Sequence, residues 1–500
     1  MEEKKFDKNS IIGITLIVVI FVWMMINSQK DAQKEQALKA KQEKIDKEKK
    51  ALEAKTKQVT TTIADTTVND TVKLQKLQGA LGSFAYSATL PSAKEGFTTV
   101  ENDLVKLTIA NKGGYISEAI LKKYEKFKKG SGQLVELIKN NNADLNIALK
   151  TVDNRQLNTK DLFFEPTLTK VGGNQVLSMK LKAGANEYLE YKYVLKPNDY
   201  LVDFDIRSQG LSKALNTSKP VDLEWNLKSY RNEKSVTYEN QNAEIYYEYE
   251  EGKISYVNQG KDKEETPIKT SFIAYKQHFF SSILMTSTPF ETSKIQSSTL
   301  VNDVKIDTVF TKQFKSTVPL AYRNGELDYK MNWYYGPTDY KILKSYEGKN
   351  LDKIIPLGWG IFGWINRFIF VPLFGFLGGF MNYGLAIILF TILIKIAMSP
   401  ITFKSFLSQA KMKVLRPEIA EISEKIKDPV KKQQETMKLY NKAGVNPMAG
   451  CIPALIQMPF LMASFRFFPS AFELRQQGFL WADDLSSFDQ IVKLPFNIPL

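Results

Sequence analysis

The chain has 500 residues, 43% of them hydrophobic, and a formal net charge of +14. A single core seldom grows beyond about 250–300 residues, so the length indicates more than one domain. The lone cysteine excludes an intramolecular disulfide framework. The lone histidine, His278, excludes a multi-histidine metal site and argues against a histidine-based catalytic triad. The basic residues are dispersed and accompany no nucleic-acid motif, so we expect adjacency to a membrane rather than specific nucleic-acid binding.

The chain opens with an apolar run over residues 11–26, preceded by a charged start. No small-residue cleavage site follows the run, so we predict an N-terminal transmembrane anchor within residues 1–29, with a signal peptide as the alternative. Lysines after the run outnumber those before it, so charge alone does not orient the anchor. We interpret residues 30–79 as a charged helical spacer and a linker rich in threonine and aspartate.

Residues 80–348 show a period of two, in which apolar and polar side chains alternate. Val202, Phe204 and Ile206, for example, alternate with two aspartates. Further runs lie at 105–109, 189–195, 223–227 and 304–310, and turn residues lie at 112–114, 172–173, 197–198 and 336–337. Half-buried antiparallel strands have this pattern, so we predict a large antiparallel β-sandwich. Its carboxylates alternate as solvated faces do, which gives no reason to expect catalysis.

Residues 354–381 are rich in aromatic side chains and glycine, and Arg367 is the only charge after Lys353. Aromatic residues at this density favour the headgroup region of a membrane. We therefore predict an interfacial amphipathic helix that leads, through a bend near residues 378–382, into the next segment. A separate transmembrane helix is the alternative.

Residues 382–402, NYGLAIILFTILIKIAMSPIT, are apolar except for a few polar side chains and one cation, Lys395. About 20 apolar residues cross the hydrocarbon core as a helix, so we predict a transmembrane helix. Thr391, Lys395, Ser399 and Thr402 fall on one face of it. A lysine in hydrocarbon costs about 2.5–3.5 kcal/mol, so we interpret this face as the lining of a wet groove. The alternative is that Lys395 snorkels to the headgroups.

Residues 403–447 carry more basic than acidic side chains and are interrupted at Pro417 and at Pro429. This pattern predicts a helical hairpin. A short basic loop beside a spanning helix is cytoplasmic by the positive-inside rule. The sandwich is then extracytoplasmic, and the N-terminus of the anchor is cytoplasmic.

Residues 448–468 are predicted to span the membrane in the return direction. A buried glutamine needs polar partners, so we expect Gln457 to face the same groove as Lys395. Arg466 is expected to snorkel near the outer end. Residues 469–500 form an amphipathic outer segment, after which no further helix closes the groove.

Several stretches match a known family. The most specific are AKMKVLRPEI, LYNKAGVNPMAGCIPALIQMPF and ELRQQGFLWADDLS, and LVKLTIANKGGYISEAIL and YYGPTDY are also similar. Over nearly its whole length the chain resembles the YidC membrane-protein insertases, in the form with a large periplasmic domain. The resemblance implies a multi-pass protein of the bacterial inner membrane. Because this family has further spanning helices after the outer segment, the chain looks C-terminally truncated.

The resemblance also implies a function without cofactor, metal or enzymatic chemistry. Such a protein is an insertase and chaperone that passes nascent transmembrane segments into the membrane through a hydrophilic groove. The implied partners are nascent membrane proteins, the Sec translocon, membrane lipids, and the ribosome with signal-recognition factors at residues 403–447. The groove cation of this family is normally arginine, and Lys395 keeps its charge without its planar bidentate fork. The other groove residues expected here are Thr391, Ser399, Thr402 and Gln457.

Two alternatives belong to other functional classes. A transporter could also use an intramembrane lysine, but it would be expected to show inverted repeats, and none is evident. A membrane-anchored carbohydrate-binding or carbohydrate-active sandwich would place the function at residues 80–348, and sugar binding by that domain would support it.

Overall fold

The computed structural model describes residues 70–257, 263–444 and 452–488. The chain divides into two compact units, Met1–Ala85 and Tyr86–Leu500. In the first unit, the description begins with helix α2 (Asp70–Leu81) and a 3-10 helix, η1 (Gly82–Phe84). The predicted anchor and the spacer up to residue 69 lie outside the described residues.

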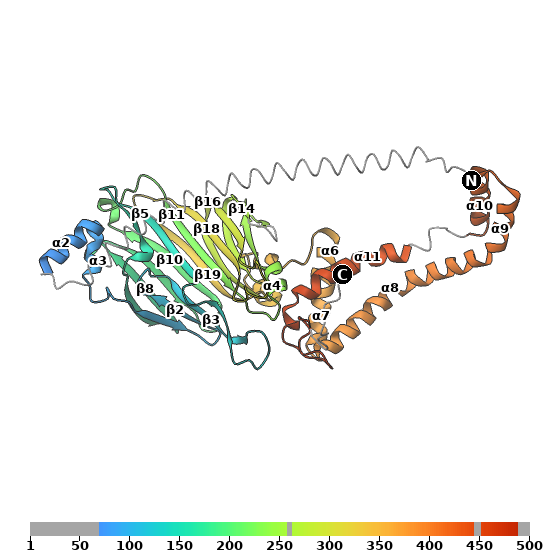
Figure 1. The fold of residues 1–500 in the computed structure, drawn as a ribbon, viewed down its shortest axis with the longest axis horizontal. Helices are drawn as coiled ribbons and strands as arrows, with labels where there is room; N and C mark the ends of the chain where they lie inside the picture. Colours follow the sequence, from blue (N-terminus) through green and yellow to red (C-terminus); the bar gives the residue numbers. More distant parts are fainter. Residues whose placement is uncertain (1–69, 258–262, 445–451, 489–500) are drawn as a thin grey trace. The chain divides into compact units, whose positions relative to one another are not determined.

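Among the described residues of the second unit, antiparallel strands between residues 97 and 337 form three sheets (Figure 1). The largest has nine strands in the order β13-β12-β15-β16-β19-β10-β9-β8-β7, the next has six in the order β14-β17-β18-β11-β5-β6, and the third pairs β1 to β4 in sequence. The strands are β1 (Phe97–Glu101), β2 (Val105–Ala110), β3 (Ile116–Glu125), β4 (Leu134–Ile138), β5 (Ala143–Lys150), β6 (Gln156–Asn158), β7 (Glu165–Val171), β8 (Asn174–Lys182), β9 (Tyr188–Leu195), β10 (Leu201–Gln209), β11 (Val221–Tyr230), β12 (Glu244–Tyr249), β13 (Lys253–Val257), β14 (Lys263–Glu265), β15 (Ile268–Lys276), β16 (Phe280–Thr292), β17 (Lys294–Thr299), β18 (Phe310–Leu320) and β19 (Asp328–Pro337). The predicted antiparallel β-sandwich is confirmed.

Aromatic side chains fill the space between the two larger sheets. Trp225 of β11 stacks on Tyr275 of β15 with ring centroids 3.6 Å apart, and Trp333 of β19 meets Trp225 edge-on at 4.9 Å. The Tyr275 hydroxyl donates to the carbonyl of Trp225 at 2.9 Å, so this buried polar atom has a partner. The alternation seen in the sequence therefore marks the side chains that point between the sheets.

Two local predictions within the sandwich are wrong. The run at 304–310 predicts a strand, but the structure has a turn there, closed by backbone N–H groups that donate to the carboxylate of Asp307. The residues at 336–337 predict a turn, but they continue β19, where Pro337 lies opposite Phe280 of β16. At 304–310, the hydrogen bonds to the Asp307 side chain stabilise a turn more than the short apolar pattern stabilises a strand. At 336–337, β19 tolerates Pro337 because proline is its last residue.

A short helix, α3 (Ala85–Ala88), precedes the first strand, and three more lie between strands: η2 (Thr159–Asp161), η3 (Leu211–Lys213) and α4 (Val236–Asn242). A helical part follows the sandwich. After the sandwich come α5 (Tyr340–Ser345), η4 (Leu351–Ile354), α6 (Gly360–Ile365), the π-helix η5 (Asn366–Phe370), α7 (Val371–Gly378), α8 (Tyr383–Val414), α9 (Arg416–Lys425), α10 (Pro429–Lys442), α11 (Ile452–Ser470) and η7 (Phe472–Leu474).

Helix α8 is longer than the predicted spanning segment. It begins at the cap residue Asn382, whose side chain accepts the N–H of Gly384 at 2.8 Å, and it runs through Pro400 to Val414. Proline removes only one backbone donor, and a long helix has enough other hydrogen bonds to continue past it. The boundary predicted between residues 402 and 403 therefore lies within one continuous helix, and the chain turns at Leu415, just before α9.

Among the described residues, two helical stretches are long and apolar enough to cross a membrane: Gly360–Gly378, whose apolar 18-residue window has a mean hydropathy of 1.5, and Tyr383–Val414, whose window has 2.2. The first consists of α6, η5 and α7 in succession and covers most of the segment predicted as an interfacial helix. Helix α11 covers most of the predicted return segment, and residues 448–451 lie outside the described part. The depth of each helix in the membrane stays a prediction.

Candidate functional site

A stripe of polar side chains runs along helix α8. Thr391, Lys395 and Ser399 are exposed, and Thr402 is half-buried. Each threonine hydroxyl donates to the carbonyl four residues earlier, at 2.8 and 3.0 Å, and keeps lone pairs that can accept a hydrogen bond. Lys395 makes no ion pair with any carboxylate in the part of the chain that the structure describes. The stripe thus presents one uncompensated cation between hydroxyl groups.

Gln457, the fifth predicted groove residue, is half-buried on helix α11. Helices α8 and α11 contact where Phe390 stacks on Phe467, with ring centroids 6.1 Å apart. Along its own helix, Lys395 lies about 7.5 Å from this contact and Gln457 about 15 Å. Among the described residues no hydrogen bond joins Gln457 to Lys395, and their position in one groove stays a prediction.

A cluster of buried phenylalanines holds α7, α8 and α11 together. Phe370, Phe374, Phe390 and Phe467 are each at most 4% exposed. Their ring centroids lie between 4.8 and 6.1 Å apart, mostly edge to face, as aromatic quadrupoles prefer. This cluster fixes the end of α8 from which the polar stripe extends.

Asn366 is a polar residue of this helical part that sequence reasoning missed. It is fully buried, and its Nδ2 donates to the carbonyls of Leu357 at 2.7 Å and Ala463 at 3.0 Å. One side chain therefore links the π-helix η5 to the loop before α6 and to α11. A single amide within an apolar aromatic run was the available signal, because such a group needs partners when buried.

The two helices after α8 carry the predicted basic hairpin. Neither α9 nor α10 has a buried side chain. The Asp428 side chain caps α10 by accepting the N–H of Val430 at 2.9 Å, and Lys438 pairs with Glu435 at 2.7 Å. The hairpin therefore presents its charges to solvent or to a partner.

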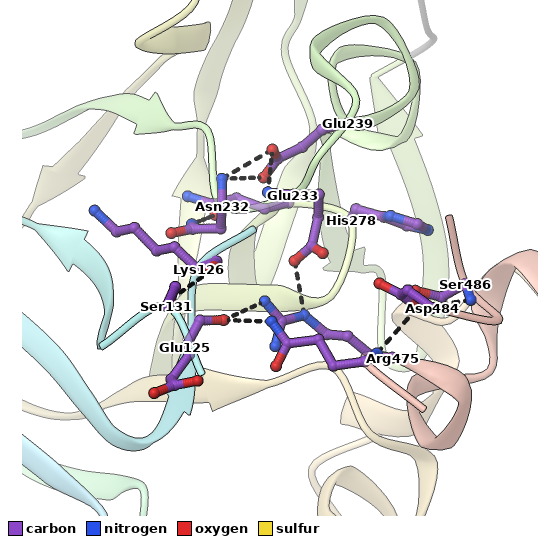
Figure 2. A network of polar contacts seen from close by, with 12 residues as sticks. Glu125, Lys126, Ser131, Asn232, Glu233, Glu239, His278, Arg475, Asp484 and Ser486 are labelled. Carbon is purple, nitrogen blue, oxygen red and sulfur yellow. Dashed lines mark hydrogen bonds and ion pairs between the residues drawn. The ribbon is translucent and has the colours of Figure 1, made fainter. Parts of the chain in front are cut away.

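A second polar site, which sequence reasoning also missed, joins the sandwich to the segment after α11 (Figure 2). The Arg475 guanidinium is buried, and its Nε donates to the Glu233 carboxylate at 2.8 Å while Nη2 donates to the carbonyl of Glu125 at 2.6 Å. The Gln476 side chain donates to the same carbonyl at 2.9 Å. His278 Nε2 lies 2.8 Å from the carbonyl of Pro469, at the end of α11. We call these contacts the Arg475 joint.

His278 and Glu239 have shifted pKa values beside this joint. Burial lowers the pKa of His278 to about 3, so the ring is neutral and its Nε2 donates to Pro469. Burial, together with the charge of Glu233, raises the pKa of Glu239 to about 8, although backbone N–H groups of Asn232 and Glu233 donate to this carboxylate. Burial also raises the pKa of Glu233. Glu233 is the carboxylate that Arg475 neutralises, so Glu239 is the one that holds a proton.

This arrangement predicts a pH dependence of stability. Because the pKa of Glu239 rises from 4.5 to about 8 on folding, the folded state binds more protons than the unfolded state between these values. Stability should therefore fall as pH rises from about 5 to 8, with a slope of at most about 1.4 kcal/mol per pH unit from this group. Thermal unfolding of the purified protein at several pH values measures the slope. Glu239→Gln should flatten it, whereas Glu264→Gln, on an exposed strand, should not; equal slopes in all three proteins would contradict the assignment.

Within the described ranges, no group of three or more His, Cys, Asp or Glu side chains could hold a metal ion. The chemistry that these sites offer is electrostatic: an exposed cation on an apolar helix and a buried ion pair at the Arg475 joint.

Two family models match the chain, one described as the 60Kd inner membrane protein over residues 374–500 and one as the YidC periplasmic domain over residues 98–372. The membrane protein insertase YidC of Parabacteroides distasonis is 37% identical over 99% of this chain and 79% of its own length, and that of Bacteroides fragilis is 36% identical over 99% and 78%. A galactose mutarotase-like protein from Lactobacillus casei covers 48% of this chain and 100% of its own, but its 12% identity and TM-score of 0.29 are too low to inform function. The chain therefore belongs to the YidC family of membrane-protein insertases.

Proposed function

We propose that the polar stripe of α8 lines a hydrophilic groove in the membrane, in which Lys395 attracts acidic residues in the polar tail of a nascent chain. The observation that carries this proposal is the state of Lys395. It lies exposed, without a carboxylate partner among the described residues, on a helix that contains an 18-residue window with a mean hydropathy of 2.2, which fits a membrane span. A cation at such a position needs water or an anion around it.

The chain is an inner-membrane protein that inserts nascent membrane proteins, and it is not an enzyme. Its family membership favours the insertase over both alternatives, a transporter and a carbohydrate-active sandwich.

The proposed mechanism follows from the dielectric cost of moving polar groups. A substrate's polar tail crosses hydrocarbon at high cost, and a wet groove that reaches into the membrane shortens the dry path. Lys395 would attract the tail, while Thr391, Ser399, Thr402 and Gln457 would replace part of its hydration. Burial of the substrate's apolar segment in lipid, at about 25 cal/mol per Å², would then drive release.

The proposal extends to topology and to partners. We infer a multi-pass protein in which the N-terminal anchor, α8 and α11 span the membrane, α6 to α7 lies at the interface, and the sandwich is periplasmic. The hairpin of α9 and α10 would receive the ribosome and signal-recognition factors, because its exposed charges suit acidic partners and RNA. The Sec translocon would take part in a subset of insertions.

Photocrosslinking tests the groove. A photoreactive residue is placed at position 391 or 457 of the protein produced from its complete reading frame, with a ribosome-bound, single-spanning nascent chain as substrate. Crosslinks to the substrate's acidic tail should fall about fivefold to tenfold in Lys395→Ala, the loss expected for about 1–1.4 kcal/mol of charge attraction. Lys395→Arg keeps the charge and should retain them.

One outcome would contradict the groove directly. If position 391 crosslinks only to lipid, and the yield does not depend on residue 395, then the lysine reaches the headgroups and lines no substrate path.

A further inference from the structure

A large open cavity lies between the sandwich and the helical part, away from the α8 stripe. Its volume is about 930 Å³. One wall comes from α4, β12 and β13 of the sandwich, and the other from η4 and the segment after it up to Trp359, from η5, and from the end of α11. The cavity therefore opens where the sandwich meets two helices that are candidates for membrane contact.

Three cations line this cavity: Lys353, Arg367 and Arg466. None of their side chains forms an ion pair or a hydrogen bond within the described ranges. The one carboxylate among the described lining residues, that of Glu244, is 3% exposed and lies 3.9 Å from the ammonium of Lys276, which is outside the lining. The lining thus has an excess of positive charge, and two guanidinium groups suited to bidentate binding of phosphate lack a partner.

Apolar side chains border the same cavity. Trp359 and Phe465 belong to its lining and are 81% and 63% exposed. On α6 and η5, close to Arg367, Trp364 and Phe368 are 55% and 67% exposed. Tryptophan and phenylalanine exposed beside basic side chains are typical of the depth at which lipid headgroups meet acyl chains.

We propose that this cavity binds the phosphodiester of a phospholipid headgroup. Arg367 and Arg466 hold the phosphate oxygens, Lys353 adds charge, and the acyl chains lie against the exposed aromatic faces of α6, η5 and α11. The amphiphilic arrangement favours a lipid over free phosphate, because a free anion would leave the aromatic border in water. It favours a lipid over an acidic protein segment as well, because the exposed aromatic side chains continue along the helices beyond the cavity.

Lipid binding to the purified full chain tests the proposal. Native mass spectrometry with added phosphatidylglycerol gives the affinity of the wild type and of Arg367→Gln/Arg466→Gln. We expect the double variant to bind this lipid about tenfold more weakly, because two charge-assisted hydrogen-bonding groups are lost. Arg367→Lys/Arg466→Lys keeps the charge without the fork and should lose less.

The matched control is Arg323→Gln, which replaces an exposed arginine in the turn between β18 and β19 that is not part of the cavity lining. It should bind lipid as the wild type does. Hydrogen exchange at the Arg475 joint shows whether each variant is folded. If Arg367→Gln/Arg466→Gln does not fold, the two single variants, Arg367→Gln and Arg466→Gln, are measured in its place.

Two results would overturn the proposal. Equal lipid affinity of the wild type and the glutamine variants would mean that the arginines serve another partner, such as an acidic protein segment. Displacement of bound phosphatidylglycerol by millimolar inorganic phosphate would mean that the cavity selects the free anion and not the lipid.

Discussion

Arg475→Ala should detach the segment that follows α11 from the sandwich and cost about 3–5 kcal/mol, the usual effect of removing one partner from a buried ion pair. The guanidinium side chain is 3% exposed and its partner carboxylate, on Glu233, is 10% exposed. Removing the cation leaves Glu233 buried without a counterion and leaves the carbonyl of Glu125 with fewer donors. It also removes the stacking of the guanidinium over the Phe280 ring at 4.8 Å.

Hydrogen exchange measures this effect where it arises. The amide of Leu485 donates to the carbonyl of Gln477 at 2.9 Å, and that of Arg475 to Phe472 at 3.0 Å. These two amides, at positions 475 and 485, should exchange at least about a hundredfold faster in the variant, since each 1.4 kcal/mol is a factor of ten.

Two companion variants separate the buried pair from a general effect of charge. Replacing Arg475 and Glu233 together by methionine and leucine should recover much of the loss, because no unpaired charge is then buried. Lys253→Ala removes an exposed ion pair with Glu250 and should leave exchange unchanged. If Arg475→Ala exchanges as slowly as the wild type, the joint does not hold the outer segment.

The sandwich was predictable because its signal is local. Val202, Phe204 and Ile206 alternate with polar residues, and each of the three is fully buried in β10. Hydrophobic burial acts on every second residue of a half-buried strand, so a single sequence carries the pattern. The order of strands across the sheets is a non-local property, since β10 pairs with β19 from more than a hundred residues further along the chain, and no period reveals such a pairing.

The two candidate sites also differ in whether their sequence signal is local. The stripe on α8 could be predicted because Thr391, Lys395 and Ser399 share a face through helical spacing alone. The Arg475 joint could not, because 242 residues separate Arg475 from Glu233 and no local period links the two positions. Helix α8 also shows the limit of local rules, since it passes through Pro400, where the isolated rule predicts a break. Whether a helix continues past a proline depends on its tertiary packing and on the hydrogen bonds of its other turns.

Reversing the charge at position 395 should reverse the substrate preference of the groove. With Lys395→Glu, a nascent chain whose tail carries aspartate should insert at least about tenfold less efficiently, because an attraction becomes a repulsion between charges that low-dielectric surroundings leave poorly screened. The same variant should accept a tail in which lysine replaces that aspartate. Protease protection of the tail in cells that produce the protein from its complete reading frame gives the efficiency of each of the four combinations.

Measuring each variant with both an acidic and a basic tail distinguishes an effect of charge from a failure to fold. A protein that merely fails to fold would insert neither substrate, whereas recovery with the lysine tail requires a folded, functioning groove. Lys395→Gln, which is neutral, should fall between wild type and Lys395→Glu for the acidic tail. Equal efficiency for the acidic and basic tails in every variant would show that residue 395 does not face the path of the substrate, and the polar stripe of α8 would then need a different partner.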